Sequence, residues 1–557
     1  MEGALTITPL GGLEEVGRNM PLFEYKGDIV IIDMGLQFPE DDMPGIDYII
    51  PNIESLKGRE KDIQGIIITH GHLDHVGAVS HLSPKLGHPP IYATGLSRGI
   101  IMKRHDDFPN MGKLNIHIIK ASDKITLGKF KIEFFHVNHN IPDSVGVVLK
   151  TPEGTVLHTG DFKFDHNPVG EEPADLARII EIASAKGGVL VLMSDSTNAE
   201  VPGYTISEKQ VQESLDEIIK QADGRIIAST FGSLISRIQE IINIAEKYGR
   251  KVTVDGYSMR SNVEIAKELG FLKAKKDTII PIRDVNKYDK NKMIIVCTGA
   301  QGEGEAVLMR IAHREHKQVQ IQRGDTVIFS SSVVPGNERS VGALKDILMY
   351  QGAKIFHSKL MDVHASGHAQ VEDLKLMLNL VKPKYLIPIH GNHFMLRIHG
   401  EIAKSIGMAD ENIIILSNGK SAIFKDGKVA ISKTSVPSNY VMVDGLGIGD
   451  VGNIVLRDRQ LMSEDGIFVI ISTIDSKTGK LKGNPDIISR GFVYLRESQD
   501  LLMEVRKRVR KIIEGSFAKE HTLNSIYLKS EIRNKMGQFL FQRTERRPMV
   551  IPVIIEV

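Results

Sequence analysis

The sequence has one cysteine, no long apolar run and almost no net charge. Cys297 is the only cysteine among 557 residues, which excludes disulfide bonds within the chain and zinc sites built from several thiolates. No apolar run approaches the length of a membrane span, and residues 1–5 lack the basic and apolar regions of a secretion signal. We therefore expect a cytoplasmic protein that makes no use of a membrane.

The charge balance excludes a surface that is basic throughout. Lys and Arg number 70 against 69 Asp and Glu, a formal net charge of +1. A polyanionic partner would therefore have to meet a local basic groove. Residues 501–557 hold a local excess of positive charge, with twelve basic and six acidic side chains. This excess indicates either a solvated helix face or a surface that contacts RNA.

The composition and the order of patterns predict an α/β protein with several domains. A hydrophobic content of 41% and a charged content of 25% are typical of globular proteins, and the length allows two or three domains. Short β-rich runs dominate residues 5–195. Helical and strand patterns then alternate over residues 207–358, as in a parallel α/β domain. A helix is predicted over 371–380 and a buried strand over 385–389.

The stretch from Thr69 to His75 holds three imidazoles and one carboxylate within six residues. In an extended backbone His70 and His72 point to the same side, whereas the adjacent Asp74 and His75 cannot both follow them toward one ion. Two neighbouring metals are therefore the natural interpretation. Imidazole and carboxylate ligands without thiolate favour zinc over manganese or magnesium.

Three more candidate ligands follow predicted strands: His139, Asp161 and His390. Each is a weak signal alone, because a single histidine after a strand is more often hydrogen-bonded structure than a ligand. Together with the opening motif they complete two coordination shells. If His390 joins the first site, the α/β region before it is an insertion.

The order His-x-His-x-Asp-His, then His, Asp and a distant His resembles the metallo-β-lactamase superfamily, and Gly11-Gly12 and Asp33 fit it too. The resemblance implies an αβ/βα sandwich and hydrolysis at two divalent metal ions, with Zn²⁺ favoured and Mn²⁺ or Mg²⁺ open. One ion would be bound by His70, His72 and His139, and the second by Asp74, His75 and His390. Asp161 would bridge them.

The middle region resembles the β-CASP nucleases of this superfamily. Asp195-Ser196-Thr197-Asn198, Thr298 to Glu303 and Ser366-Gly367-His368-Ala369 carry the resemblance, and the likeness to the ribonuclease J family runs almost from end to end. It implies a metallo-β-lactamase domain (1–206 and 359–427) interrupted by a β-CASP α/β domain (207–358). A linker (428–452) and a small C-terminal α/β domain (453–557) would follow.

The resemblance implies hydrolysis of single-stranded RNA, 5′-to-3′ exonucleolytic and endonucleolytic, that leaves 5′-phosphates. It assigns catalytic roles to His368, Asp195 and Asp74. His368 would contact the scissile phosphate and donate a proton to the departing 3′-oxygen, oriented by Asp195. Substrate-binding roles fall to Ser233, Ser366, Gly367 and His364. The C-terminal domain resembles one used for self-association, which implies a homodimer or homotetramer.

Several positions depart from the family pattern. Glu14 stands where glycine is usual, Leu234 where asparagine is usual, and Asn392-His393 replaces an acidic-aromatic pair. Two other functions stay open: hydrolysis of small amides such as β-lactams, and an RNA-binding subunit with a silent site. A nucleotide cofactor is not expected, because residues 299–304 lack the dinucleotide-binding fingerprint. The polar surroundings of three further histidines predict surface positions: His105, His313 and His316.

Overall fold

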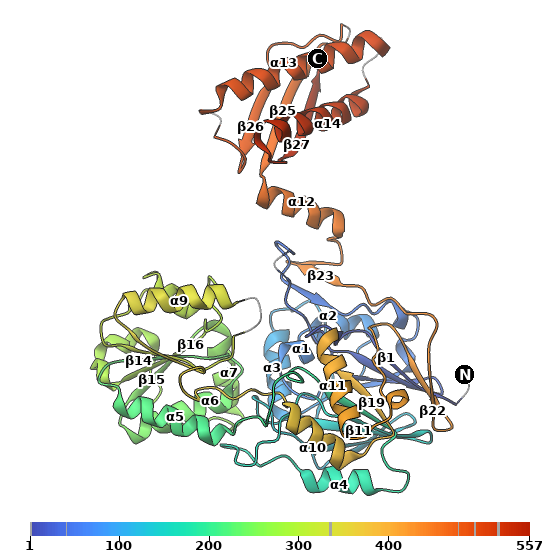
Figure 1. The fold of residues 1–557 in the computed structure, drawn as a ribbon, viewed down its shortest axis with the longest axis vertical. Helices are drawn as coiled ribbons and strands as arrows, with labels where there is room; N and C mark the ends of the chain where they lie inside the picture. Colours follow the sequence, from blue (N-terminus) through green and yellow to red (C-terminus); the bar gives the residue numbers. More distant parts are fainter. Residues whose placement is uncertain (1–2, 41, 334–336, 477, 495–496, 521–523) are drawn as a thin grey trace. The chain divides into compact units, whose positions relative to one another are not determined.

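The computed structural model describes residues 3–40, 42–333, 337–476, 478–494, 497–520 and 524–557, without the side chains of 517–520. The chain forms two compact units (Figure 1). The first unit comprises the chain up to Gln37 together with Ile50–Tyr440, and the second comprises Phe38–Ile49 together with Val441–Val557. Within the described residues, no helix is both long and apolar enough to cross a bilayer.

Two mixed sheets lie at the centre of the first unit. The larger has the order β22-β21-β1-β3-β4-β6-β7-β8 and the smaller β19-β13-β12-β11-β10-β9. The larger sheet consists of β1 (Leu5–Pro9), β3 (Pro21–Tyr25), β4 (Asp28–Ile32), β6 (Ile63–Ile67), β7 (Ile91–Ala93), β8 (Ile116–Ile118), β21 (Ala422–Lys425) and β22 (Lys428–Ile431). The smaller consists of β9 (Lys124–Leu127), β10 (Phe130–His136), β11 (Val145–Thr151), β12 (Gly154–His158), β13 (Val191–Asp195) and β19 (Tyr385–Ile389).

Alternating side chains of the two sheets meet in one core, in which Phe23, Val30, Phe134 and Ile387 are almost fully buried. Helices cover the outer faces: α1 (Leu73–Val76), α2 (Val79–Leu82), α3 (Gly95–His105), α4 (Leu176–Ser184), α10 (Val371–Val381) and α11 (His393–Ser405). The last three pack their apolar sides on the smaller sheet in a second core. This arrangement is the predicted αβ/βα sandwich.

A separate five-stranded parallel sheet, with the order β15-β16-β14-β17-β18, forms the inserted region. Its strands are β14 (Ile226–Ser229), β15 (Lys251–Asp255), β16 (Met293–Cys297), β17 (Thr326–Phe329) and β18 (Lys354–His357). Its helices are α5 (Glu208–Gln221), α6 (Ile235–Lys247), α7 (Tyr257–Glu268), α8 (Val307–Ala312) and α9 (Glu338–Tyr350). The region is an insertion because β13 and β19, on either side of it in sequence, are parallel neighbours in the smaller sheet.

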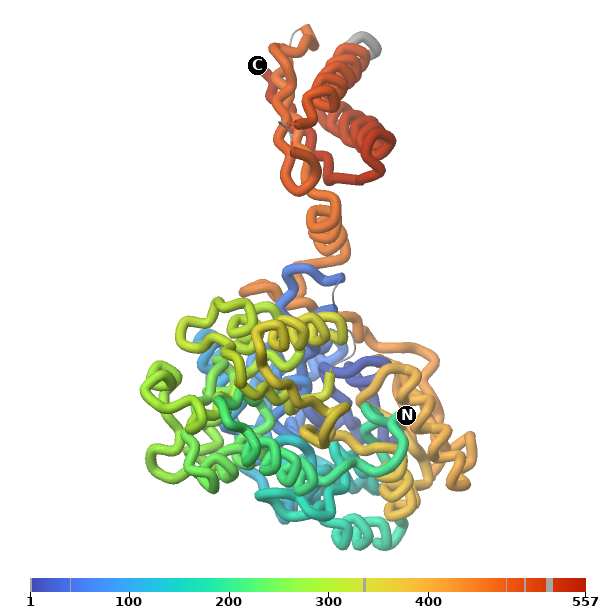
Figure 2. The backbone as a smooth tube through the Cα atoms, turned by 60° about the vertical axis from the view of Figure 1, so that its left-hand side comes forward, coloured from blue at the N-terminus to red at the C-terminus, as the bar shows by residue number. Residues whose placement is uncertain are grey.

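The second unit has a three-stranded sheet with helices on one face (Figure 2). Its elements are β5 (Tyr48–Ile50), β23 (Val441–Asp444), β24 (Gly447–Ile448), α12 (Asn453–Glu464), β25 (Ile467–Ile474), β26 (Asp486–Arg490), α13 (Gln499–Glu520), α14 (Ser525–Thr544) and β27 (Met549–Glu556). The sheet has the order β26-β25-β27. Alternate residues of β25, beginning with Phe468, are fully buried under α13 and α14, whereas those between them are only half-buried.

The structure differs from the predicted linker at its start. Residues 428–431 form β22, which pairs with β21 as a hairpin in the larger sheet. The turn between them is Asp426-Gly427, and both residues have positive φ, 51° and 73°. Asp-Gly is the preferred sequence of a two-residue hairpin turn because its backbone twist matches that of the strands. The dipeptide therefore marks a turn within the domain and not its end.

Candidate metal centre

The first three candidate ligands come together at the end of β6. His70 and His72 lie in the loop between β6 and α1, and His139 follows β10. The Nδ1 atom of His72 lies 3.1 Å from Nε2 of His70 and 3.0 Å from Nε2 of His139. Three ring nitrogens thus converge on one small volume, which could hold a metal ion.

A second group surrounds the carboxylate of Asp161, with Asp74, His75 and His390 as the other members. Asp161 Oδ2 lies 3.2 Å from His75 Nε2, and its Oδ1 lies 3.1 Å from His390 Nδ1. The other nitrogen of His390, Nε2, is 3.2 Å from Asp74 Oδ2. Two carboxylates and two imidazoles thus face one another, a set of oxygen and nitrogen donors that suits a divalent metal ion.

Asp161 also faces the first group. Its Oδ2 lies 3.7 Å from Nε2 of His70 and 3.9 Å from Nε2 of His139. The carboxylate is buried between the two sets of imidazoles. The arrangement therefore places one acidic side chain within reach of two adjacent cations.

Further contacts fix the orientation of the candidate ligands. Asp33, at the end of β4, accepts a hydrogen bond from His75 Nδ1 at 2.7 Å and another from the amide of Thr69 at 2.8 Å. The Gly367 carbonyl lies 2.6 Å from His139 Nδ1. Such bonds to the second ring nitrogen set the tautomer and direction of a metal-binding histidine.

Protonation of the first group suits a cation. Burial, followed by the charge of neighbouring rings, holds the pKa of His70 and His139 well below the usual value. Burial also lowers the pKa of His72 to about 4, against the charge of Asp74. These rings are neutral at physiological pH, and a neutral imidazole is the form that binds a metal.

In the second group burial is outweighed by the charge of Asp161, which raises the pKa of His75 and His390 well above the usual value, so a cation there would displace protons. Burial opposes ionisation of Asp161, but the charges of His390 and His75 outweigh it and keep the pKa low.

Beside the two groups lies a histidine and carboxylate pair. His368 Nδ1 is 2.8 Å from Asp195 Oδ2, and Asp195 also accepts a hydrogen bond from the amide of Thr197 at 2.9 Å. The His368 amide bonds the Ser366 hydroxyl at 3.2 Å, and the Asn198 amide group donates to that hydroxyl at 2.6 Å. The motif that begins at Asp195 and the motif that begins at Ser366 thus meet in one place.

The other predicted substrate-binding residues lie around the same loops. Ser233 is half-buried in the loop between β14 and α6, and its neighbour Leu234 is buried. The ring of His364 lies 6.4 Å from the ring of Phe231 in that loop. The inserted region therefore meets, at this point, the segment that carries His368.

One contact near the site has no signal in the sequence, and two histidines predicted at the surface are buried. Asn19 donates to the Asp74 carbonyl at 3.1 Å, and no sequence motif indicates this. His105 and His316, predicted at the surface, are both buried. His316 Nε2 bonds Asp255 at 2.9 Å, and His105 Nε2 lies 2.7 Å from the Gly112 carbonyl, so polar neighbours stabilise buried rings here.

Sequence models of four protein families match the chain in consecutive segments. They are the metallo-beta-lactamase superfamily (residues 14–227), the ribonuclease J beta-CASP domain (223–348), the Zn-dependent metallo-hydrolase RNA specificity domain (358–414) and the ribonuclease J C-terminal domain (454–557). Together they span both units.

Proteins named as ribonucleases J are similar to this chain over nearly its whole length. Ribonuclease J2 of Bacillus subtilis is 40% identical over 99% of this chain and 98% of its own length. The chain belongs to the ribonuclease J family. Ribonuclease J 1 of Streptococcus pyogenes is 41% identical over 98% and 96%, and ribonuclease J 2 of Staphylococcus aureus is 38% identical over 99% and 98%. Membership confirms the resemblance seen in the sequence.

A solved structure agrees with the fold. A protein of unknown function from Enterococcus faecalis V583 superposes with a TM-score of 0.56 at 18% identity, over 76% of this chain and all of that one. The domain matches confirm the metallo-β-lactamase sandwich with an inserted β-CASP domain and a C-terminal domain. They support a metal-dependent ribonuclease that acts on RNA and do not favour a small-amide hydrolase.

Proposed function

We propose that this chain hydrolyses single-stranded RNA at a centre of two metal ions, both from the 5′ end and internally, and leaves 5′-phosphates. The observation that carries the proposal is the position of Asp161, whose carboxylate faces both groups of histidines at 3.1 to 3.9 Å. A single site would not need two imidazole groups that share one acidic side chain.

The donor set fits two cations. We assign one ion to His70, His72 and His139, the other to Asp74, His75 and His390, and Asp161 to both. Nitrogen-rich sites without thiolate favour Zn²⁺, while Mn²⁺ and Mg²⁺ are the alternatives. When bound, such a pair lowers the pKa of a shared water and stabilises charge on the reacting phosphate.

His368 is the proposed general acid. Burial disfavours its charged form, but the Asp195 carboxylate outweighs this and raises the pKa of the ring above its ordinary value. The raised pKa favours the protonated ring that a general acid needs. Asp195 bonds Nδ1, which leaves Nε2 to donate that proton to the departing 3′-oxygen.

The loops around His368 supply the proposed phosphate seat. Ser366 presents a hydroxyl, Gly367 allows close approach of the backbone, and His364 lies on the same segment. Ser233, on the facing loop of the inserted domain, would hold the terminal 5′-phosphate. A pocket for one phosphate would hold the 5′-monophosphate of an RNA and so fix the position of the RNA relative to the proposed metal ions. A 5′-triphosphate would not fit such a pocket.

The test compares end-labelled RNAs that carry a 5′-hydroxyl, monophosphate or triphosphate, each with Zn²⁺, Mn²⁺ or Mg²⁺. We expect faster shortening from a monophosphate end, internal products from every RNA, and two metal ions per chain by elemental analysis. The double variant Asp74→Ala with His75→Ala should abolish cleavage while RNA binding persists.

The matched control is Asp106→Ala with His117→Ala, which removes an exposed acid and an exposed histidine from the same domain. It should keep wild-type cleavage and two ions. Unchanged cleavage by the Asp74 and His75 variant would refute the assigned metal chemistry, and one ion at saturation would refute the paired site.

We also propose that the C-terminal domain joins copies of the chain into a dimer or tetramer. The sheet face away from α13 and α14 exposes four apolar side chains by 36–45%: Ile488, Ile551, Val553 and Ile555. Apolar patches of this kind mark association surfaces. Val553→Glu should shift the protein to monomer in sedimentation velocity, whereas Lys529→Glu on the helix face should not.

A further inference from the structure

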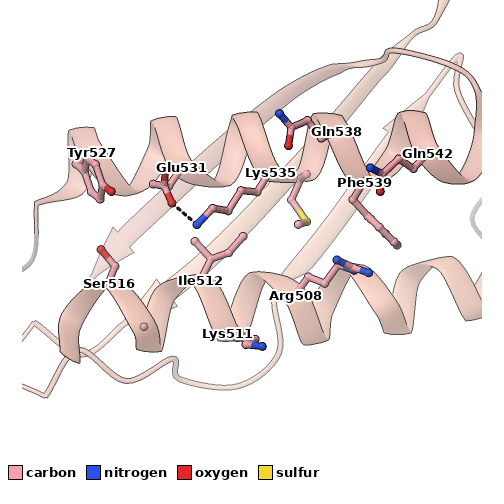
Figure 3. Close-up of a pocket in the computed structure, with 12 residues that line it drawn as sticks. Arg508, Lys511, Ile512, Ser516, Tyr527, Glu531, Lys535, Gln538, Phe539 and Gln542 are labelled. Carbon is pink, nitrogen blue, oxygen red and sulfur yellow. Dashed lines mark ion pairs between the residues drawn. The ribbon is translucent and has the colours of Figure 1, made fainter. Parts of the chain in front are cut away.

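We propose that the groove between α13 and α14 binds single-stranded RNA, as a contact separate from the metal centre. The groove encloses 440 Å³ and lies wholly between these two helices (Figure 3). Its volume is that of a site for a small ligand or for part of a chain. The proposal rests on the proposed function only in taking RNA to be the substrate.

The groove is rich in cations. Arg508 and Lys511 line it from α13 and Lys535 from α14, whereas Glu531 is the only acidic residue in its lining. Glu531 pairs with Lys535, as the dashed line in Figure 3 marks. Among the described residues, no carboxylate forms an ion pair with Arg508 or Lys511. Two positive charges are therefore available to an anion.

Neighbouring arginines of α13 have other roles. Arg506 donates to the Pro485 carbonyl at 3.3 Å, and Arg510 donates to the side chain of Asn484 at 3.0 Å. These two hold the helix to the loop before β26. Some basic residues of α13 thus make structural contacts, and others line the groove. On a uniformly solvated helix face, the basic residues would not be divided in this way.

An exposed aromatic ring accompanies the charges. The Arg508 guanidinium lies over the buried Phe539 ring, 4.1 Å from its centroid, which fixes the position of this cation. Tyr527 lines the far end of the groove with 47% of its surface exposed, so its ring is open to a base. Cations that follow a phosphate backbone beside rings on which bases stack are the features of single-strand binding. An acidic peptide would use the charges but has no base to stack on the Tyr527 ring, so RNA fits better.

A glycine keeps the groove open. Gly515 lies on the wall formed by α13, and a Cβ atom at this position would have no neighbour within 4 Å. A larger side chain here would enter the groove without altering its charge. A substitution at Gly515 therefore distinguishes RNA bound in the groove from RNA held only by general electrostatic attraction.

The experiment uses the full chain and fluorescent oligouridylates of about 5 and about 20 nucleotides. Binding is measured by anisotropy in a chelator, and cleavage of the short RNA is measured with metal. Two groove variants are tested: the double variant Arg508→Ala with Lys511→Ala, and the single variant Gly515→Leu. The control is the double variant Lys507→Ala with Lys529→Ala, which removes two exposed lysines outside the groove. Circular dichroism checks that each variant is folded.

We expect the groove double variant and Gly515→Leu each to weaken binding of the long RNA about tenfold, and the control double variant by less than about twofold. The groove double variant should also reduce the slope of log affinity against log salt by about 1.4, the loss of two phosphate contacts. Cleavage of the short RNA should be unchanged in all of them.

Equal weakening by both double variants, or unchanged binding by Gly515→Leu, would overturn the proposal in favour of diffuse attraction. Displacement of the long RNA by polyglutamate at a lower concentration than by unlabelled oligouridylate would identify an acidic protein segment as the occupant and overturn it too. Failure of the wild type to cut short RNA would instead contradict the proposed function, so the two failures are distinguishable.

Discussion

Glu14 and His393, two residues that depart from the family pattern, pair with each other. His393 Nδ1 lies 2.8 Å from Glu14 Oε1 although the residues are 379 positions apart. Glu14 ends β2 (Leu13–Glu14), which pairs with β20 (Gly391–Asn392), and His393 follows β20 as the first residue of α11. Next to this contact the amide of His390 donates to the Gly12 carbonyl at 2.8 Å. The two departures are therefore linked structurally, at the edge of the proposed second metal site.

The pair should contribute little stability, because both side chains are exposed, by 61% and 37%. A double-mutant cycle with Glu14→Ala and His393→Ala should give a coupling of about 1 kcal/mol or less in urea denaturation. Glu14 has a φ of 59°, so Glu14→Gly should be neutral or stabilising by up to about 1 kcal/mol. A coupling well above this range would show that the pair holds the site together.

Gly367→Ala should damage the metal centre through His139. A Cβ at this position would lie 2.6 Å from His139 Cε1 and 2.7 Å from Nδ1, too close for any real contact. The ring must move and lose its bond to the Gly367 carbonyl. We expect RNA cleavage to fall about 10- to 100-fold and the metal content to drop below that of the wild type.

Gly304→Ala is the control for this substitution, because a Cβ there has no neighbour within 4 Å. It should leave activity and metal content unchanged. If Gly367→Ala retained full metal content and full activity, His139 could not be a ligand held by that carbonyl.

Glu171 should make stability fall as the pH rises. Burial raises the pKa of its carboxyl group from 4.5 to about 8, against the opposing charge of Lys163, and Oε2 has no hydrogen-bond partner among the described residues. Between these pH values the folded state keeps a proton that the unfolded state has lost. The contribution of Glu171 to the free energy of unfolding is therefore fully present below pH 4.5, decreases as the pH rises, and is lost by about pH 8.

Glu171→Gln should remove that loss and be more stable than the wild type at pH 8 by up to a few kcal/mol. Urea denaturation at several pH values measures the effect. Glu172→Gln, a change at an exposed neighbour, should leave the pH dependence as in the wild type. Parallel pH profiles for Glu171→Gln and wild type would contradict the raised pKa.

The sequence predicted the candidate site better than it predicted the contacts around it. The side chains proposed as ligands in the first motif could be picked out because they lie within six residues, and the strand over 385–389 has the bounds of β19. The partnership of Glu14 with His393 could not be found, because nothing local indicates which distant segments meet. Burial of His105 and His316 was missed for the same reason, since their polar partners are provided by the fold.

Arg237 should be the most costly single charge to remove. It is fully buried at the start of α6, where it donates to Glu240 Oε2 at 3.0 Å and to the Val363 carbonyl at 2.8 Å. It also bonds Glu208, which accepts a hydrogen bond from Lys163 at 2.9 Å. One guanidinium thus joins the inserted domain to the segment before His368 and to the loop after Asp161.

Arg237→Ala should lower the free energy of unfolding by about 3–5 kcal/mol, because it leaves buried carboxylates without a partner. Arg237→Lys should recover only part of this loss, since an ammonium cannot reproduce the planar fork of donors. Arg260→Ala is the matched control: its pair with Asp255 is half exposed, so its loss should cost no more than about 1 kcal/mol. Urea denaturation measures the free energy of unfolding of both variants. Equal losses for Arg237→Ala and Arg260→Ala would mean that water or a shifted carboxylate pKa compensates for the missing buried charge. The Arg237 guanidinium would then not be what holds the inserted domain to the neighbouring segments.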